Sequence, residues 1–359
     1  MNINKKGRFL RTLAAVVMTV AVFGVPAASG QTNTGKPDLS GVTITVGQQG
    51  TDTQYGFLAS HLFDNTPYKL KFATFPSPSA NLTALASGNV DIANNVSQWT
   101  ATQAAAAASP LWTSATAPYK NILVTGPGNA KQFDRFVIAV SRMSGITDIK
   151  QSKGKRWGII PGSSYSLFSA VVLKKLGWTA KDVTIVNLDA TNQVLALETG
   201  QVDVLFNVTD NLPAALQHGA KIIGTANDYG LTIYTGFLAN RKSLDDTLKG
   251  RAIEDFVRRM VAYQNWFVQH QAEAQTALVN GLHLTTAQAA SVWKYARVVP
   301  VAPATISSYS QDLADLAFES GLIKQKVDAT VLLDNRYANV IDGTAQQTNL
   351  LMNLKASYK

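Results

Sequence analysis

Small polar residues recur directly after predicted strands, at points where they open predicted helices. The first turn of a helix leaves backbone N–H groups without partners and carries the positive end of the helix dipole. Serine and threonine hydroxyls add further donors beside those amides, so the combination suits a small oxyanion such as a sulfonate, sulfate, phosphate or carboxylate. Four segments show the pattern: Gln48-Gln49-Gly50-Thr51, Ser77-Pro78-Ser79, Ser163-Ser164-Tyr165 and Thr191-Asn192.

Helix capping is the alternative for any one of these residues, since serine, threonine and asparagine are preferred N-cap residues. Four such segments in two similar halves of the chain favour anion binding. Aromatic side chains would shape the rest of the pocket, because Trp99, Tyr165 and Tyr234 fall beside predicted loops or crossing strands. Asn95, just after a predicted strand, is a further candidate. The aromatic residues of the helical region are assigned to the core: Tyr263, Trp266 and Trp293.

Patterns for catalysis or metal binding are weak. The histidines at 61, 218, 270 and 283 have no partners at metal-ligand spacing, and neither a nucleophile-elbow motif nor a phosphate loop is present. The chain has no cysteine, which excludes disulfides, thiolate metal sites and a lipid-modified N-terminal cysteine. We therefore expect a binding protein without catalytic residues, metal or cofactor, although a Ser-His-Asp triad assembled only by folding stays open.

The elements that would position these residues are indicated by an internal repeat. Residues 84–92 (ALASGNVDI) recur as residues 196–204 (ALETGQVDV), 112 positions later. Each copy reads as a helix end, a glycine stop and a short strand entered through Val-Asp. Two copies at this spacing predict two similar α/β lobes that face each other across a cleft. Asp91 and Asp203 are interpreted as structural residues that enter a strand after a turn.

Strands and helices alternate in both halves, which implies an α/β fold of two lobes with parallel sheets and right-handed crossovers. Strands at 136–140 and 232–239 are the expected crossings between the lobes. The domain prediction is a signal peptide (1–30), the first part of lobe I (40–134), lobe II (135–235), a return to lobe I with C-terminal helices (236–340) and a tail (341–359).

The N-terminus has the order of features of a secretory signal: four basic residues, an apolar run too short to span a bilayer, and small residues near 27–30. An exported chain without cysteine fits a Gram-negative periplasm, with no lipid anchor. The formal charge of +9 falls to +5 once the four signal cations are left out. This mild charge, without basic clusters interleaved with aromatics, does not indicate nucleic-acid binding.

An ordered set of motifs resembles one family. The set comprises Phe75-Pro76, Leu85-x-x-Gly88-x-Val90-Asp91, Lys153-Gly154-Lys155-Arg156, Pro161-Gly162-Ser163-Ser164, Trp178-Thr179-x-x-Asp182-Val183 and Leu197-x-x-Gly200-x-Val202-Asp203. It is similar to the periplasmic substrate-binding proteins of ABC transporters for aliphatic sulfonates, taurine and nitrate, whose broader relatives bind pyrimidine precursors of thiamine. The resemblance runs from about residue 44 to 335.

The resemblance implies a hinged two-lobe fold of the type II periplasmic binding proteins, with the ligand in the cleft. It also implies a monomer that delivers its ligand to an inner-membrane permease. The anion-binding positions that it carries over are Gln49, Ser77, Ser79, Gly162, Ser163 and Ser164. One segment departs from the family: where members often carry Trp-Asp-Pro-Tyr, this chain has residues 207–211 (NVTDN), in which Asp210 would replace the acid with a slip of one position.

Together these observations predict a periplasmic solute-binding protein of an ABC importer that binds a small organic anion, foremost an aliphatic sulfonate such as taurine or an alkanesulfonate. Two alternatives remain open: a pyrimidine or aromatic carboxylate as the ligand, and an enzyme or a sensor lobe on the same fold.

Overall fold

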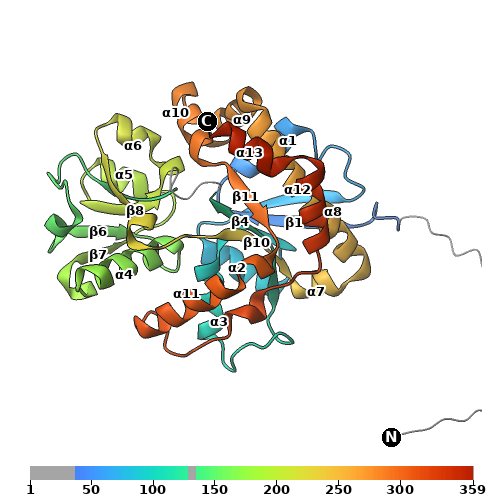
Figure 1. The fold of residues 1–359 in the computed structure, drawn as a ribbon, viewed down its shortest axis with the longest axis horizontal. Helices are drawn as coiled ribbons and strands as arrows, with labels where there is room; N and C mark the ends of the chain where they lie inside the picture. Colours follow the sequence, from blue (N-terminus) through green and yellow to red (C-terminus); the bar gives the residue numbers. More distant parts are fainter. Residues whose placement is uncertain (1–36, 128–134, 359) are drawn as a thin grey trace, which may run out of the picture. The chain divides into compact units, whose positions relative to one another are not determined.

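Two β-sheets organise the part of the chain that this computed structural model describes, residues 37–127 and 135–358 (Figure 1). Residues 38–359 group into one unit, apart from residues 1–37. The predicted signal peptide therefore lies outside the described residues. Among the described helices, none has the length and hydropathy needed to cross a membrane.

The first sheet has the strand order β11-β4-β10-β3-β1-β2 and the second has the order β7-β6-β8-β5-β9. We call the first sheet with its helices lobe I and the second with its helices lobe II. The strands are β1 Thr43–Gln48, β2 Lys69–Thr74, β3 Ile92–Ser97, β4 Tyr119–Pro127, β5 Phe136–Val140, β6 Arg156–Ile159, β7 Thr184–Asn187, β8 Val204–Val208, β9 Lys221–Thr225, β10 Thr235–Asn240 and β11 Val298–Val301.

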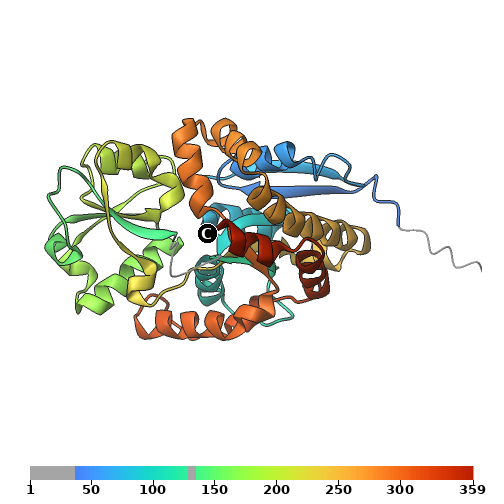
Figure 2. The same ribbon diagram turned by 45° about the horizontal axis from the view of Figure 1, so that its top comes forward.

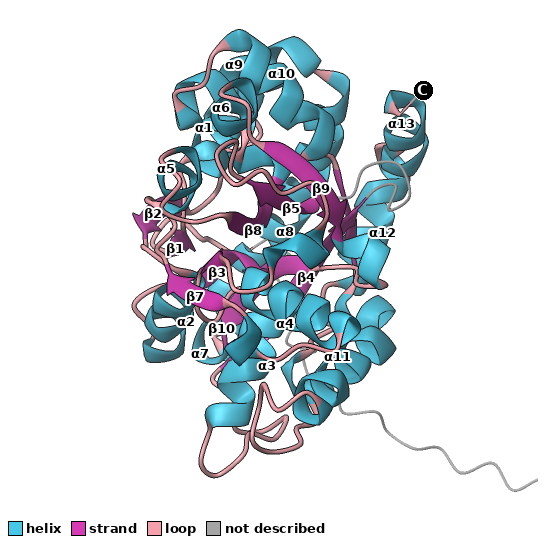
Figure 3. Ribbon diagram, turned by 90° about the vertical axis from the view of Figure 1, so that its left-hand side faces the viewer, coloured by secondary structure: helices cyan, strands magenta, loops and turns pink. Residues whose placement is uncertain are grey.

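Helices cover both faces of each sheet (Figures 1 and 3). The α-helices are α1 Asp52–Ser60, α2 Pro78–Ser87, α3 Gln98–Ala107, α4 Ser164–Leu176, α5 Gln193–Glu198, α6 Pro213–Gln217, α7 Arg241–Asp245, α8 Thr247–Gln269, α9 Gln271–Leu282, α10 Thr286–Tyr295, α11 Ser307–Glu319, α12 Ala338–Gln347 and α13 Leu350–Ser357. One apolar cluster of lobe I joins its sheet to α1, α8 and α9, and another joins it to α2 and α3. In lobe II, α4 packs on one face and α5 and α6 on the other.

The predicted α/β fold of two lobes is confirmed, with one difference in the sheets. Their cores are parallel as expected, since β1 pairs with β2 and β3, and β6 pairs with β7 and β8. Each sheet also contains antiparallel pairs: β10 with β3 and β4, β11 with β4, and β5 with β8 and β9. The sheets are mixed because β5 in the second sheet, and β10 and β11 in the first, run against the direction of the parallel core.

The internal repeat occupies equivalent places in the two sheets. Gly88 and Gly200 both have a left-handed backbone, with φ of 81° and 70°, and end the preceding helical turns. The Asp91 carboxylate accepts a hydrogen bond from the Thr45 backbone N–H at 2.9 Å, and Asp203 accepts one from the Arg156 N–H, also at 2.9 Å. The structural interpretation of both aspartates is thus confirmed, because each ties the start of β3 or β8 to the neighbouring parallel strand.

The C-terminal segment 341–359, predicted to be a tail, is helical in its described part. Ile341 of α12 and Leu350 of α13 are buried in the same cluster as α8. The Asn353 side chain donates a 2.8 Å hydrogen bond to Asn265 on α8. The sequence did not predict these helices because the apolar residues of the segment have only weak helical periodicity. A few deeply buried residues, such as Ile341 and Leu350, hold them on lobe I.

Two helices link the lobes. Leu313 and Ala314 of α11 and Trp99 of α3 are buried in the apolar cluster of lobe II, although α3 follows directly from a lobe I strand. Figure 2 shows α11, in orange-red, running along the side of the molecule from lobe I to the green helices of lobe II. The lobes therefore make direct contact through these helices.

Candidate functional site

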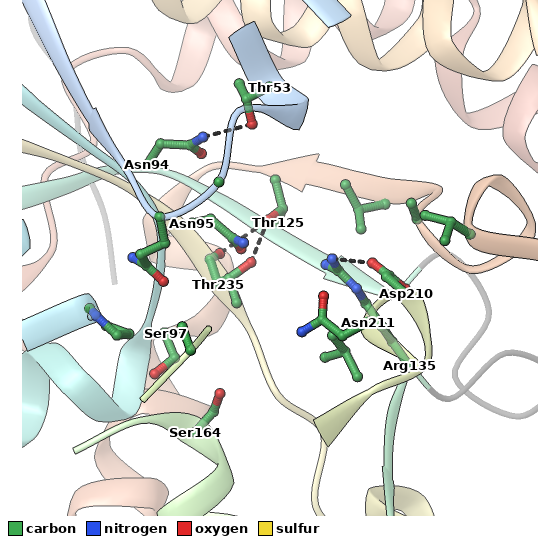
Figure 4. A pocket seen from close by; sticks show the side chains of 18 of the residues that line it. Thr53, Asn94, Asn95, Ser97, Thr125, Arg135, Ser164, Asp210, Asn211 and Thr235 are labelled. Atoms are coloured by element: carbon green, nitrogen blue, oxygen red, sulfur yellow. Dashed lines mark hydrogen bonds and ion pairs between the residues drawn. The ribbon is translucent and has the colours of Figure 1, made fainter. Parts of the chain in front are cut away.

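A cavity of about 470 Å³ lies between the two lobes and takes side chains from both sheets. Its volume is in the range of sites that enclose a small organic molecule. Figure 4 shows polar side chains from both lobes directed toward it. The polar lining residues are Gln49, Thr53, Asn94, Asn95, Ser97, Thr125, Arg135, Ser163, Ser164, Tyr165, Gln193, Asp210, Asn211, Thr235 and Gln264, with Tyr263 at the edge of an apolar group.

A β-bulge in lobe I places two amides at the cavity. The pairing of β3 with β10 slips so that Asn94 and Asn95 lie opposite the single residue Phe237. Asn95 has a φ of 57°, a left-handed conformation that asparagine tolerates better than most residues with a side chain. Bulges re-aim side chains and are frequent beside functional sites. Asn94 then donates a 2.9 Å hydrogen bond to Thr53 at the start of α1.

The loop between β1 and α1 brings an available donor. Gln49 lines the cavity, and its side-chain Nε2 is buried without a hydrogen-bond partner among the described residues. A buried donor without a partner costs free energy, so a ligand oxygen at this point would remove that cost. The loop itself is anchored to α9, because the Thr51 hydroxyl donates a 2.7 Å hydrogen bond to the Gly281 carbonyl.

Lobe II contributes the N-terminus of α4. Ser163 is the N-cap, and its hydroxyl accepts from the Tyr165 N–H at 3.2 Å, while Ser164 is the first helical residue. The cap thus takes up the Tyr165 N–H, and the Ser166 N–H donates to the Ser163 carbonyl at 3.1 Å, which leaves the Ser164 N–H as the helix-terminal amide that could bind an anion. Burial raises the pKa of the Tyr165 phenol, which keeps this hydroxyl neutral as a hydrogen-bond donor.

One ion pair lies at the cavity wall. Arg135, just before β5, pairs with Asp210, just after β8, and both line the cavity (Figure 4). The Asp210 side chain is 7% exposed and that of Arg135 is 24% exposed. The Asp210 carboxylate offsets much of the charge of the Arg135 guanidinium. The pair therefore adds little net charge to the cavity wall, while the guanidinium still provides charged N–H donors.

The segment that departs from the family pattern forms an amide network. The buried Asn207 side chain donates to Gln193 at 3.0 Å and accepts from Asn211 at 3.0 Å. Gln193 and Asn211 both line the cavity. This stretch, in which the resemblance leads one to expect Trp-Asp-Pro-Tyr, thus has no aromatic residue and carries amides whose positions are fixed by one another.

The structure distributes the predicted site residues over three places. Those at the cavity are Gln49, Asn95, Ser163, Ser164, Tyr165 and Asp210. Those at the contact between the lobes are Ser79, Trp99 and Gly162: the Trp99 indole N–H donates to the Ser166 hydroxyl at 3.3 Å, and a Cβ on Gly162 would come within 2.9 Å of the Ser79 hydroxyl.

The remaining predicted residues have structural partners outside the cavity lining. Gln48 is buried and donates to the Gln54 side chain at 3.3 Å, and Thr51 holds α9 as described above. Ser77 caps α2, accepting from the Ala80 N–H at 3.2 Å. Tyr234 packs its ring edge-on against Tyr309, with the ring centres 4.8 Å apart. For Ser77 the capping alternative therefore describes the observed contact.

Sequence reasoning missed Arg135, the Asn94 amide and the facing threonines Thr125 and Thr235, whose hydroxyls lie 3.0 Å apart. Arg135 immediately precedes the strand predicted to cross between the lobes. Its place beside that crossing could have identified it as a candidate cavity residue. Tyr263, assigned to the core, is buried but also borders the cavity. The bulge that aims the amides gives no sequence signal, because it depends on the pairing partner.

The four histidines lie away from the cavity lining. His61 pairs with Asp64 and His218 with Glu198, both at the surface. Within the described residues no group of histidine and acidic side chains is placed to hold a metal ion.

A comparison with protein-family models identifies one family for this chain. Residues 40–249 match the family model described as "ABC transporter, phosphonate, periplasmic substrate-binding protein". A putative aliphatic sulfonates-binding protein of Bacillus subtilis (strain 168) is 26% identical over 203 residues, which is 56% of this chain and 60% of the length of that relative.

Solved structures show the same fold. The alkanesulfonate-binding protein SsuA from Xanthomonas axonopodis pv. citri, bound to MOPS, superposes with a TM-score of 0.70 at 20% identity over 84% of this chain and 99% of its own. The periplasmic aliphatic sulphonate binding protein SsuA from Escherichia coli gives 0.67 at 21% identity, over 83% and 92%.

Proposed function

Because the chain belongs to the family of periplasmic phosphonate-type substrate-binding proteins of ABC transporters, we propose that its cavity binds a small organic anion, foremost an aliphatic sulfonate. The observation that carries this proposal is the convergence of hydrogen-bond donors from both lobes on one cavity: the N-terminal turn of α4, Gln49 Nε2 and Arg135. A tetrahedral oxyanion group offers three oxygens to such donors at once.

Ligand contacts from both lobes would favour the arrangement in which the lobes are held together. A ligand shifts such an equilibrium only by its different affinity for the two arrangements, and donors on both sides supply that difference. A permease in the inner membrane would then recognise the ligand-bound form. In this proposal the protein is exported by its N-terminal signal, carries no lipid anchor and acts as a monomer without catalysis.

A thermal-shift panel tests the ligand class. The purified protein is heated with ethanesulfonate, octanesulfonate, taurine, methylphosphonate, nitrate, acetate, benzoate or thymine in large excess. A ligand that binds only the folded state stabilises it by about 2.7 kcal/mol at one hundred times its dissociation constant, so the melting temperature rises. We expect the largest rise with the sulfonates.

Other outcomes of the panel separate the alternatives. If only methylphosphonate raises the melting temperature, the ligand is a phosphonate instead of a sulfonate, and the proposed role as a solute-binding protein stands. A rise with thymine or benzoate would support the pyrimidine or aromatic carboxylate alternative. If no anion in the panel raises the melting temperature, the proposed ligand class is wrong.

A further inference from the structure

The cavity between the lobes has a second, apolar part, which we call the lobe I chamber. Its wall is mainly apolar and is formed by Phe237, Met260, Phe267, Leu278, Leu282, Leu284, Val292, Ala296 and Val298. Tyr263 and Gln264, which lie between Met260 and Phe267 on the same face of α8, also line the cavity. Except for Phe237 these residues come from α8, α9, α10, β11 and their connections, after the last residue that the family model matches. The family match therefore does not account for this part of the cavity.

The chamber walls are shielded from bulk water. Met260 is 1% exposed, Val292 2%, Phe237 4%, and Phe267 and Leu278 6% each, yet all of them border the same cavity. Apolar side chains that face an empty volume lose the dispersion contacts of a close-packed core. Apolar cavities in proteins stay dry and bind apolar molecules. The mainly apolar wall of the chamber thus suits an apolar group better than water.

The chamber joins the polar part of the cavity along two elements. On β10, Thr235 and Phe237 are two residues apart, and both line the cavity, so the strand leads from the polar part to the chamber. On α9, Leu282 follows Gly281, whose carbonyl accepts the hydrogen bond from Thr51 in the loop that carries Gln49. A molecule with its oxyanion group at these donors could therefore extend an apolar tail past Thr235 or Leu282.

We propose that the lobe I chamber binds the apolar tail of the ligand, so that the protein selects amphiphilic organic anions with an alkyl or aryl tail over short ones. The proposal rests on the proposed anion site, since that site sets the position of the head group. Each methylene that enters the chamber is expected to raise affinity about fourfold, the equivalent of ~0.8 kcal/mol.

The test is calorimetric titration of the protein with ethyl, butyl, hexyl and octyl sulfonates, and with phosphonates and carboxylates of the same chain lengths. We expect affinity to rise with chain length in the head-group series that binds. Affinity that is flat from ethyl to octyl in every series overturns the chamber proposal. If sulfonates fail to bind while another series shows the chain-length rise, only the sulfonate head group is wrong. No binding in any series overturns both proposals.

Two variants locate the tail. Ala296→Phe fills the chamber from the residue that follows the end of α10, and Ala287→Phe is the matched control at an exposed position of that helix. Leu282→Gln keeps the side-chain volume but places an amide in the chamber, so it remains informative if the filled variant fails to fold. We expect octyl affinity to fall at least tenfold in Ala296→Phe and Leu282→Gln, with ethyl affinity changed less than twofold. Equal losses for both chain lengths would contradict a tail site.

Discussion

At the scale of single residues, the cavity combines many neutral donors with one compensated cation. The Asp210 carboxylate balances the charge of Arg135 at this cavity wall, and an anionic ligand would compete with that carboxylate for the guanidinium. Asparagine, serine, threonine and glutamine side chains supply the other polar contacts. In the proposed function, such a lining would recognise the anion mainly through directed hydrogen bonds and only weakly through net charge.

Substitutions in the ion pair are predicted to have opposite effects on anion affinity. Arg135→Gln removes a charged donor and leaves the Asp210 carboxylate to repel the ligand, so we expect at least a tenfold loss, of about 1.5–3 kcal/mol. Asp210→Asn removes the competing charge and should leave affinity equal or higher. Calorimetric titration with the best sulfonate measures both, alongside the melting temperature. Equal losses in both variants would mean that the pair only maintains the structure.

Asp203 is predicted to make stability depend on pH. The hydrogen bonds from the Arg156 side chain lower the pKa of this carboxyl, and the Arg156 backbone N–H lowers it further. Because the pKa of Asp203 is lower in the folded state, its ionised carboxylate stabilises the fold. This stabilisation is fully present at pH values above the pKa in the unfolded chain, about 3.9, and is lost as the pH falls through the pKa in the folded protein.

Asp203→Asn should therefore reduce the free energy of unfolding by about 1–3 kcal/mol at pH 7. The difference between the variant and the unaltered protein should narrow below about pH 4. Urea unfolding at several pH values measures it. Two stability curves that stay parallel down to pH 2 would contradict the assignment.

At the scale of elements, the start of α4 was predicted from the sequence as part of the binding site, and its residues Ser163 and Ser164 line the cavity. Gly162 turns the chain with a left-handed φ of 72°, Ser163 caps the helix, and Ser164 takes the first helical position. Proline is well tolerated at that first position, because its N–H would have no partner in the helix. The first amide can thus be removed without breaking the helix.

Ser164→Pro is predicted to weaken anion binding through loss of the backbone donor, by about tenfold, while Ser164→Ala removes only the hydroxyl and should cost less. The preceding residue has the extended backbone that a following proline requires, with φ of −90° and ψ of 170°. Thr247→Pro, at the first position of α8 and outside the cavity lining, is the matched control. Unchanged affinity in a folded Ser164→Pro protein would exclude the α4 amide from the site.

At the scale of the whole described unit, the cavity depends on how the lobes meet. On one side Trp99 of α3 bonds to Ser166 of α4, and on the other Gln288 of α10 donates to Gln217 of α6 at 3.4 Å. Gly162 lies at the first of these contacts, where a Cβ would come within 2.9 Å of the Ser79 hydroxyl and 3.1 Å of the Gln103 side chain. Close approach of the lobes therefore requires glycine there.

Gly162→Ala and Gly177→Ala form a matched pair that tests this role. Both glycines are left-handed, with φ of 72° and 67°, so each alanine should cost roughly 1–2 kcal/mol of stability. Nothing lies within 4 Å of a Cβ at Gly177, whereas at Gly162 the Cβ meets lobe I. We expect only Gly162→Ala to weaken ligand binding, measured by titration and denaturant unfolding. Equal affinities in the two variants would remove Gly162 from the closure of the lobes.

Much of the fold follows from the sequence alone. The repeat of residues 84–92 at 196–204, its two glycine stops and its two strand-entering aspartates determined two similar α/β lobes, because these signals act over a few neighbouring residues. The loops after β1 and β6 were also predicted to bear polar residues, since strand ends and helix starts are local patterns. The structure places Gln49, Ser163 and Ser164 from these loops at one cavity.

The rest was decided by tertiary structure, for a physical reason. The bulge that aims Asn94 and Asn95 depends on how β3 pairs with β10, more than a hundred residues away. The partnership of Arg135 with Asp210 and the lobe I chamber likewise need side chains from distant segments to meet. Local patterns carry no information on contacts between distant segments. The sequence therefore predicted the two lobes and the polar loops after β1 and β6, whereas only the folded chain determined which side chains line the cavity and how far its apolar part extends.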